Sequence, residues 1–184
     1  WDDDFDTDYG YSGMVQFAVA LRDSSIADPG SGSNGFESDN DGSGSTNTPA
    51  TDPIFSNVSM FGPKVFPSTT INTNYKRAMH LRRNTQIDIY NSFFAGYKDG
   101  LFVDGSAARQ NLVSGELNLF GVSIAYCSGN YFPDDSLNVV RNYFLDASRN
   151  NDTLTDHALL QITDPFNYAY PDFRPMAGSP VLSG

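Results

Sequence analysis

The chain has 184 residues and carries 22 Asp and Glu against 11 Lys and Arg, so its formal net charge is −11. This length fits a single domain with its own core. The acidic charge repels nucleic-acid phosphates and anionic membrane surfaces, and no apolar run approaches the roughly 20 residues that span a bilayer. We therefore expect no nucleic-acid partner and no membrane insertion of this segment.

The start of the chain, its composition and its one cysteine bear on the compartment in which the protein resides. The chain begins at Trp1 without an initiator methionine or a charged-then-apolar leader, so we interpret it as a processed chain or a fragment. Many Asn, Ser, Thr and Gly residues together with 14 % aromatic residues favour a secreted or cell-surface setting. The one cysteine, Cys127, ends an apolar strand-like run, and we expect a buried, unreactive thiol.

Short strands separated by loops are predicted through the first two thirds of the chain. Residues 14–23 are rich in β-branched and aromatic residues, which is typical of a strand. Loops rich in Ser, Gly, Asp and Pro follow, and 54–63 form a second strand that ends at Gly-Pro. The later strands come as short-then-long pairs, at 78–84 with 85–97 and at 100–106 with 116–127.

The long strands look like copies of one another. Asn57 and Asn91 stand at matching places, and Gly121 lies near the equivalent place in the third copy. Strands that repeat at a coil-like period are the signature of a solenoid, in which stacked coils share one core. An ordinary β-sandwich also has short strands and turns. The short-then-long rhythm favours the solenoid.

The last third of the chain departs from this rhythm. Apolar residues recur at helical spacing within 134–150, where Asp135 or Ser136 could act as the N-cap. We therefore predict one amphipathic helix, in a helix-containing insertion at 133–152, that packs on the coils or caps them. The stretch 163–184 contains so many helix and strand breakers that we expect an extended tail.

Five segments, in order along the chain, resemble a known family. They are DDDFDTDYGYSGMVQF, NGFESDNDGSGSTNTP, FSNVSMFGP, RNTQIDIYNSFFAGY and PDFRPMAGSPVLSG. Together they are similar to a largely uncharacterised group of exported right-handed parallel β-helix proteins of Bacteroidota. The resemblance implies an all-β fold in which 1–184 form a single domain, the C-terminal coils of such a β-helix. It implies no established activity, so no catalytic residue follows from it.

Two acidic clusters carry the strongest local signal for a site. Alternating carboxylates share one face of an extended chain, and the clusters lie about one coil apart, so stacked coils would set them about 4.8 Å from each other. Calcium, which binds about six to eight oxygens, would relieve the repulsion. Two solvated acidic turns are the alternative. The candidate calcium ligands are Asp4, Asp6, Asp8, Glu37, Asp39 and Asp41.

Basic residues follow the second acidic cluster in the short segment of the next coil. Arg82 and Arg83 could pair with Glu37 or Asp39 across the stack, which we favour, or face an anionic sugar. The two histidines, His80 and His157, have no Cys or Asp at metal-ligand spacing. We interpret both as structural or exposed.

Two functions follow from these features. The first is a noncatalytic secreted or cell-surface protein that binds a glycan or another surface component along its elongated face and is stabilised by a divalent cation. The alternative is a calcium-dependent polysaccharide lyase that resembles pectate lyases, with Arg82 or Arg83 as the proton-abstracting base. The sequence has no nucleophile elbow, phosphate-binding loop or paired-cysteine zinc pattern.

Overall fold

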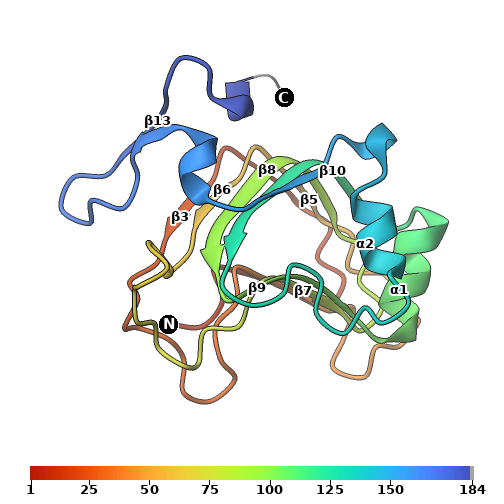
Figure 1. The fold of residues 1–184 in the computed structure, drawn as a ribbon. Helices are drawn as coiled ribbons and strands as arrows, with labels where there is room; N and C mark the ends of the chain where they lie inside the picture. Colours follow the sequence, from red (N-terminus) through yellow and green to blue (C-terminus); the bar gives the residue numbers. More distant parts are fainter. Residues whose placement is uncertain (183–184) are drawn as a thin grey trace.

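Two parallel β-sheets face each other in the computed structural model, which describes residues 1–182 (Figure 1). The chain alternates between the sheets, so each of the first four coils adds to both, whereas the last coil adds β11 to the second sheet alone. The first sheet has the order β1 (Phe5–Thr7), β4 (Phe36–Ser38), β7 (Arg77–Arg82) and β9 (Asp99–Asp104). The second consists of β2 (Met14–Gln16), β3 (Val19–Leu21), β5 (Ile54–Ser56), β6 (Ser59–Phe61), β8 (Asp88–Tyr97), β10 (Asn118–Cys127) and β11 (Asp152–Leu154).

Every strand pair within these two sheets is parallel, coil against coil. A β-sandwich would be built from antiparallel sheets, so this alternative is excluded. The predicted parallel stacking of coils is confirmed. A right-handed and fully closed winding stays a prediction.

The core lies between the sheets and is built from side chains that repeat from coil to coil. The Phe36 ring packs against those of Phe5, Phe55 and Phe94 at centroid distances of 5.0, 4.7 and 5.6 Å. Such offset and edge-on contacts are the favourable geometries for aromatic rings. Cys127 is buried in the same core, and burial raises the pKa of its thiol. The predicted buried thiol is therefore confirmed.

The second sheet bends at one residue in each coil. These residues, which the flanking register aligns, all have positive φ angles: Phe17 60°, Asn57 56°, Asn91 45°, Gly121 64° and Asn150 54°. Glycine and asparagine enter this left-handed region at the lowest cost. The predicted equivalence of the two strand asparagines and the glycine is therefore confirmed, and its reason is a bend shared by all coils.

The bend also explains two differences from the predicted strands. The strands expected at 14–23 and 54–63 are each divided in two, as β2 with β3 and as β5 with β6. A left-handed residue interrupts the extended backbone at each division. β8 and β10 each continue as one strand, although their pairing also skips the bend residues Asn91 and Gly121.

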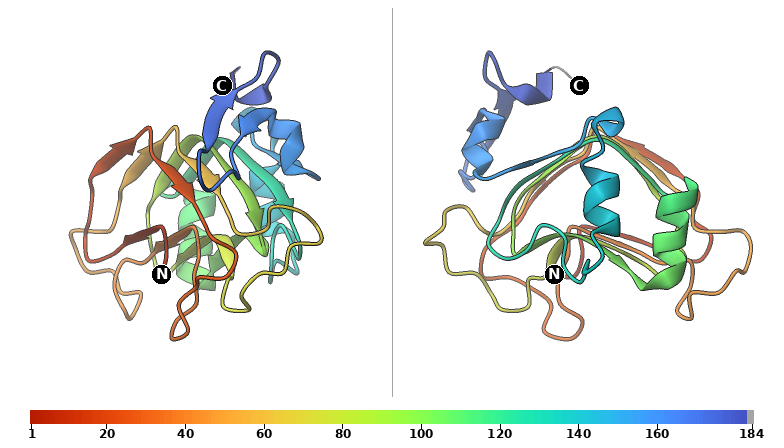
Figure 2. Two further views of the ribbon diagram at one scale, coloured as in Figure 1. Left: turned by 90° about the vertical axis from the view of Figure 1, so that its left-hand side faces the viewer. Right: turned by 45° about the vertical axis from the view of Figure 1, so that its right-hand side comes forward.

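Two helices lie side by side and cover the side of the molecule on which β9 of the first sheet continues into β10 of the second (Figures 1 and 2). The first, α1 (Gly105–Ser114), was not predicted, because it buries only Ala108, Asn111 and Leu112 and has no continuous apolar stripe. The second, α2 (Val139–Phe144), confirms the helix expected near the C-terminus but is shorter than predicted. It is followed by the 3-10 helix η1 (Ala147–Arg149).

The C-terminal segment stands over the outer surface of the second sheet (Figure 2). It contains η2 (His157–Leu160), the antiparallel strands β12 (Ile162–Asp164) and β13 (Asp172–Pro175), and η3 (Pro180–Leu182). Phe173 stacks on Phe61 of β6 at 5.1 Å and so anchors the segment. The tail expected at 163–184 is therefore partly regular, and its residues 183–184 lie outside the described part. Among residues 1–182, no helix has the length and apolar character to cross a membrane.

Candidate functional site

Alternation along the first sheet sends charged side chains to its outer face. Phe36 and Ser38 of β4 point into the core, whereas Glu37 between them points outward. The register places Asp6, Glu37 and His80 opposite one another on β1, β4 and β7. We name the resulting outer surface the charged strip, and it comprises Asp6, Glu37, Asp39, His80, Arg82, Arg83 and Asp104.

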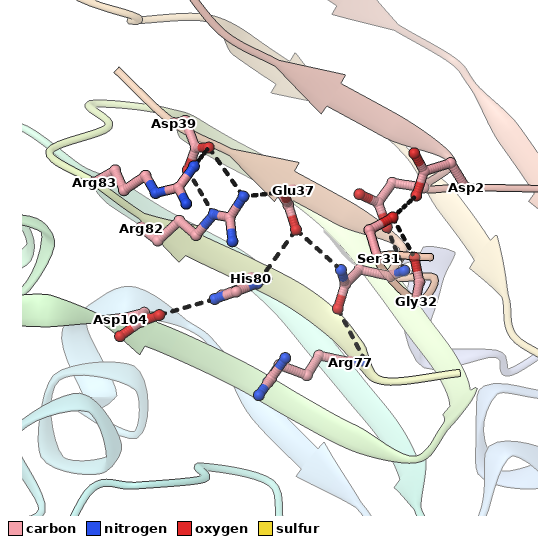
Figure 3. Close-up of polar contacts among 12 residues, drawn as sticks. Asp2, Ser31, Gly32, Glu37, Asp39, Arg77, His80, Arg82, Arg83 and Asp104 are labelled. Atoms are coloured by element: carbon pink, nitrogen blue, oxygen red, sulfur yellow. Dashed lines mark hydrogen bonds and ion pairs between the residues drawn. The ribbon is translucent and has the colours of Figure 1, made fainter. Parts of the chain in front are cut away.

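An arginine holds two of the predicted calcium ligands in this strip (Figure 3). Nε of Arg82 donates to Oδ1 of Asp39 at 2.7 Å, and Nη2 donates to Oδ2 at 3.1 Å and also to Glu37 Oε1. Arg83 adds a hydrogen bond from Nη1 to Asp39 Oδ2 at 2.9 Å. The predicted ion pairs across the stack are present.

His80 links two carboxylates on neighbouring strands (Figure 3). Its Nδ1 lies 3.3 Å from Oε2 of Glu37, and its Nε2 lies 3.1 Å from Oδ2 of Asp104. The ring stacks on Phe102 of the next coil at 5.1 Å. His80 is therefore a buried structural residue. Asp104 escaped the sequence analysis because its partner stands 24 residues earlier in the chain.

The contacts fix the charges of the strip. Burial raises the pKa of Glu37, but the hydrogen bond from His80 and the charge of Arg82 outweigh it and leave the pKa below its usual value. Burial alone would lower the pKa of Arg82, yet hydrogen bonding to Asp39 and the charge of Glu37 raise it. At neutral pH both side chains are ionised, because each stabilises the charged form of the other.

The other predicted calcium ligands separate into different environments. Asp4 lies 3.2 Å from Nε of Arg22. Asp41 accepts hydrogen bonds from Ser43 and Ser45, which hold the pKa of its carboxyl well below the usual range and close the loop that follows β4. Asp8 accepts a hydrogen bond from the backbone of Tyr9 at 2.7 Å. The six carboxylates therefore have several separate partners.

Among the six predicted calcium ligands, Asp6 is the one whose carboxylate is repelled by neighbouring carboxylates without a compensating cation in the described chain. It stacks against Glu37, as predicted, and has no cationic partner within residues 1–182. Burial, and then the charges of Glu37 and Asp39, raise its pKa. In the described part of the chain, no three His, Cys, Asp or Glu side chains are arranged to hold a metal ion. Calcium binding stays a prediction.

A pocket of about 250 Å³ lies at the bend of the second sheet, where the sequence analysis expected no site. Phe93 of β8 and Pro180 and Val181 of η3 form its apolar walls. Its polar lining comes from four successive coils and consists of Asn57, Asn91, Ser92, Ser123, Asn150, Asn151 and Asp152. The matching Asn57 and Asn91 were the sequence signal that could have located this pocket. The wall formed by the C-terminal segment depends on tertiary packing and leaves no such signal.

A family model described as a pectate-lyase-like β-helix domain matches residues 1–159. The match includes every strand of both parallel sheets and ends before the antiparallel pair of the C-terminal segment. No curated protein and no solved structure has a significant match to the chain.

Proposed function

Because the chain belongs to the family of pectate-lyase-like β-helix domains, we propose that it is a noncatalytic secreted or cell-surface domain that binds a glycan. Domains of this kind are often extracellular. The proposal includes right-handed winding of the coils and kinship with the exported Bacteroidota proteins that the sequence resembles.

The charge state of Arg82 supports a noncatalytic role. A lyase of this fold needs a base that removes a proton from a sugar carbon, and an arginine does so only from its neutral form. Arg82 instead donates to Asp39 and Glu37, and these contacts raise its pKa. The side chain thus carries a permanent positive charge that is already shared by two carboxylates. This single observation carries the proposal.

The binding part of the proposal is supported by the shape of the molecule. Stacked coils present side chains at about 4.8 Å intervals, which suits a polymer with repeated units. Polar groups of this kind are aligned both in the charged strip and in the pocket at the bend. A surface of shallow, repeated contacts favours an extended glycan over a small isolated ligand.

The calcium-dependent lyase is the second candidate, and the exposure of Arg83 favours it. The side chain of Arg83 is 41 % exposed and, among residues 1–182, makes one ion pair, to Asp39, so part of its guanidinium is open to an anionic sugar. The family description points in the same direction. We rank this candidate second because its base would have to lose a proton beside the Asp39 carboxylate, which disfavours the neutral form.

A divalent cation is proposed at the acidic end of the charged strip. Calcium there would bind Asp6 and Asp8, together with backbone oxygens, and would relieve the repulsion between Asp6 and Glu37. Glu37 and Asp39 suit such a site less well, because Arg82 already occupies their oxygens. The cation would stabilise the first coil and would take no part in a reaction.

Affinity electrophoresis tests the proposed function. The chain is run through native gels that contain one neutral or acidic polysaccharide each, and retardation in at least one gel is expected. The same polymers are incubated with the chain and calcium, and the ultraviolet absorbance of unsaturated ends is recorded. Retardation without new absorbance supports the proposal. New absorbance would support the lyase instead, and unaltered mobility in all gels would leave glycan binding without support.

A further inference from the structure

We propose that the pocket at the bend binds one neutral sugar unit of a glycan, an inference that rests on the glycan binding proposed above. The pocket lies on the second sheet, whereas the charged strip lies on the first. Asn57, Asn91 and Gly121 bend three successive coils beneath it. The left-handed backbone therefore aligns polar side chains from separate coils around one cavity.

The carboxylate of Asp152 is the acceptor that a ligand in the pocket would use. Oδ1 of Asp152 is buried and has no hydrogen-bond partner within residues 1–182. A buried acceptor without a donor is unfavourable and rare in folded proteins. Asp152 pairs with Ser123, which pairs with Phe93, so all three stand in one row across β11, β10 and β8. Because the protein covers Oδ1, a ligand hydroxyl placed over this row would donate to the other carboxylate oxygen, Oδ2, which is not buried.

Further hydrogen-bonding groups in the pocket are free of partners inside the described chain. The side chains of Asn91 and Ser123 make no hydrogen bond within residues 1–182, although both line the pocket. Asn57 uses its Oδ1 to accept from Ser56 Oγ at 2.7 Å, and its amide donors remain available. The pocket thus offers a carboxylate acceptor, a hydroxyl and two amides.

Two other polar residues of the lining have a structural task, which sets them apart from this group. Ser92 Oγ accepts from the backbone N–H of Val58 at 3.0 Å, and Asn151 Oδ1 accepts from that of Val122 at 2.8 Å. Both backbone groups directly follow a left-handed residue and lack a ladder partner there. Ser92 and Asn151 therefore maintain the bend and are not assigned to the ligand.

The mixture of groups fits a neutral sugar ring. Ring hydroxyls both donate and accept, so one can donate to Asp152 while its neighbour accepts from Asn91. The apolar C–H face of a ring can pack on Val181 and Phe93. Asp152 is the one ionisable side chain among the described lining residues, and its charge repels uronic or sulfated sugars. The volume of about 250 Å³ is smaller than the about 300–1,000 Å³ of sites for drug-sized ligands, which limits the occupant to about one ring.

Nuclear magnetic resonance titration of the full chain tests this inference. The probes are mannohexaose, xylohexaose and cellohexaose as neutral glycans, trigalacturonate as the acidic one, and putrescine as a cationic control. Neutral probes are expected to shift the side-chain amide signals of Asn57 and Asn91 in a saturable way. Asp152→Ala should weaken that binding about 10-fold, because a hydrogen bond to a charged group is lost.

Matched variants separate the pocket from general effects. Glu116→Ala removes an exposed carboxylate outside the pocket and should leave the affinity unchanged. If Asp152→Ala fails to fold, Ser123→Ala replaces it, with a smaller loss of affinity expected. Equal affinity in wild type and both pocket variants would overturn the inference.

The remaining outcomes distinguish the inference from the proposed function. Binding of trigalacturonate alone, with shifts confined to the arginine side-chain signals of the charged strip, would overturn the neutral-sugar pocket and leave glycan binding intact. Shifts of the Asn57 and Asn91 amides with putrescine alone would also overturn it, since the pocket would then be a cation site. No response to any glycan would contradict both proposals.

Discussion

Arg82 and Asp39 form a two-point ion pair across neighbouring coils, with Nε to Oδ1 at 2.7 Å and Nη2 to Oδ2 at 3.1 Å. A planar guanidinium matches a carboxylate at two points, which an ammonium group cannot do. Because β4 and β7 are in parallel register, the two residues meet although 43 positions separate them in the chain. The pair joins coils and keeps Arg82 charged.

Replacement of Arg82 should therefore destabilise the fold. Arg82→Met leaves Asp39, whose side chain is 7 % exposed, as a buried charge with a single partner, and the free energy of unfolding should fall by about 3 kcal/mol. Arg82→Lys keeps the charge but loses the two-point contact, so a loss of about 1 kcal/mol is expected. Urea denaturation measures both. Equal stability of wild type and Arg82→Met would show that the pair does not join the coils.

Asp3 makes the stability depend on pH in an unusual direction. Burial, moderated by the backbone hydrogen bond from Asn34, raises its pKa from 3.8 to about 6. The folded chain thus binds a proton at Asp3 more tightly than the unfolded chain, so the contribution of Asp3 is favourable below pH 4 and is lost as the pH rises to 6. Asp3→Asn should stabilise the protein by about 1 kcal/mol at pH 7.5 and leave it unchanged at pH 3.5, after allowance for partial solvent exposure.

Urea denaturation at the two pH values measures this difference, and Asp41→Asn is its control. The pKa of Asp41 is held below the usual range, so its contribution is favourable above pH 4 and is lost as the pH falls. Asp41→Asn should therefore destabilise the protein at pH 7.5. The assignment for Asp3 fails if Asp3→Asn is destabilising at pH 7.5 as well.

The bend of the second sheet predicts an ordered series of substitutions at Asn91. Its φ of 45° is costly for a β-branched residue, so Asn91→Val should lower the free energy of unfolding by about 1–2 kcal/mol. Asn91→Gly should change it by less than about 0.5 kcal/mol, because glycine adopts this conformation freely and already stands at the equivalent Gly121. Thermal and urea denaturation provide the ranking. A more stable Val variant would show that the bend does not require this backbone conformation.

Calcium should raise the melting temperature if a cation occupies the acidic end of the charged strip. Free calcium at about 100 times its dissociation constant would add about 2.7 kcal/mol of stability, and magnesium should substitute poorly. Asp6→Asn is the cleaner test of the site, since Asp39→Asn also weakens the pair with Arg82. Differential scanning fluorimetry with calcium, magnesium or chelator gives the answer. Melting curves that do not respond to calcium in the wild type would rule the site out.

The sequence predicted the periodic features of this fold because each coil repeats them. Alternation along short strands gave the stacked parallel sheets, and the matching Asn57 and Asn91 marked a bend that all coils share. The stacking of Asp6 on Glu37 followed from the same period. Features repeated at one position per coil are visible in a single sequence, since each coil serves as a reference for the next.

Features that occur once were harder to predict. Helix α1 buries few apolar residues, and its opening Gly105 and Ser106 were assigned to the end of the strand predicted at 100–106. The approach of Asp104 to His80 and of Val181 to Phe93 depends on how coils and tail pack, which no local pattern records. The pocket at the bend was missed because one of its walls comes from the C-terminal segment.

Isothermal titration calorimetry with an intact polysaccharide identified by affinity electrophoresis tests the central claim of binding without cleavage most directly. Injections at two temperatures avoid a binding enthalpy that happens to be near zero. Saturable heat that returns to the baseline after each injection, in the presence of calcium, is the predicted result. Heat that continues between injections and disappears in Arg82→Lys or Arg83→Lys would mean turnover, and it would contradict the assignment of a noncatalytic domain.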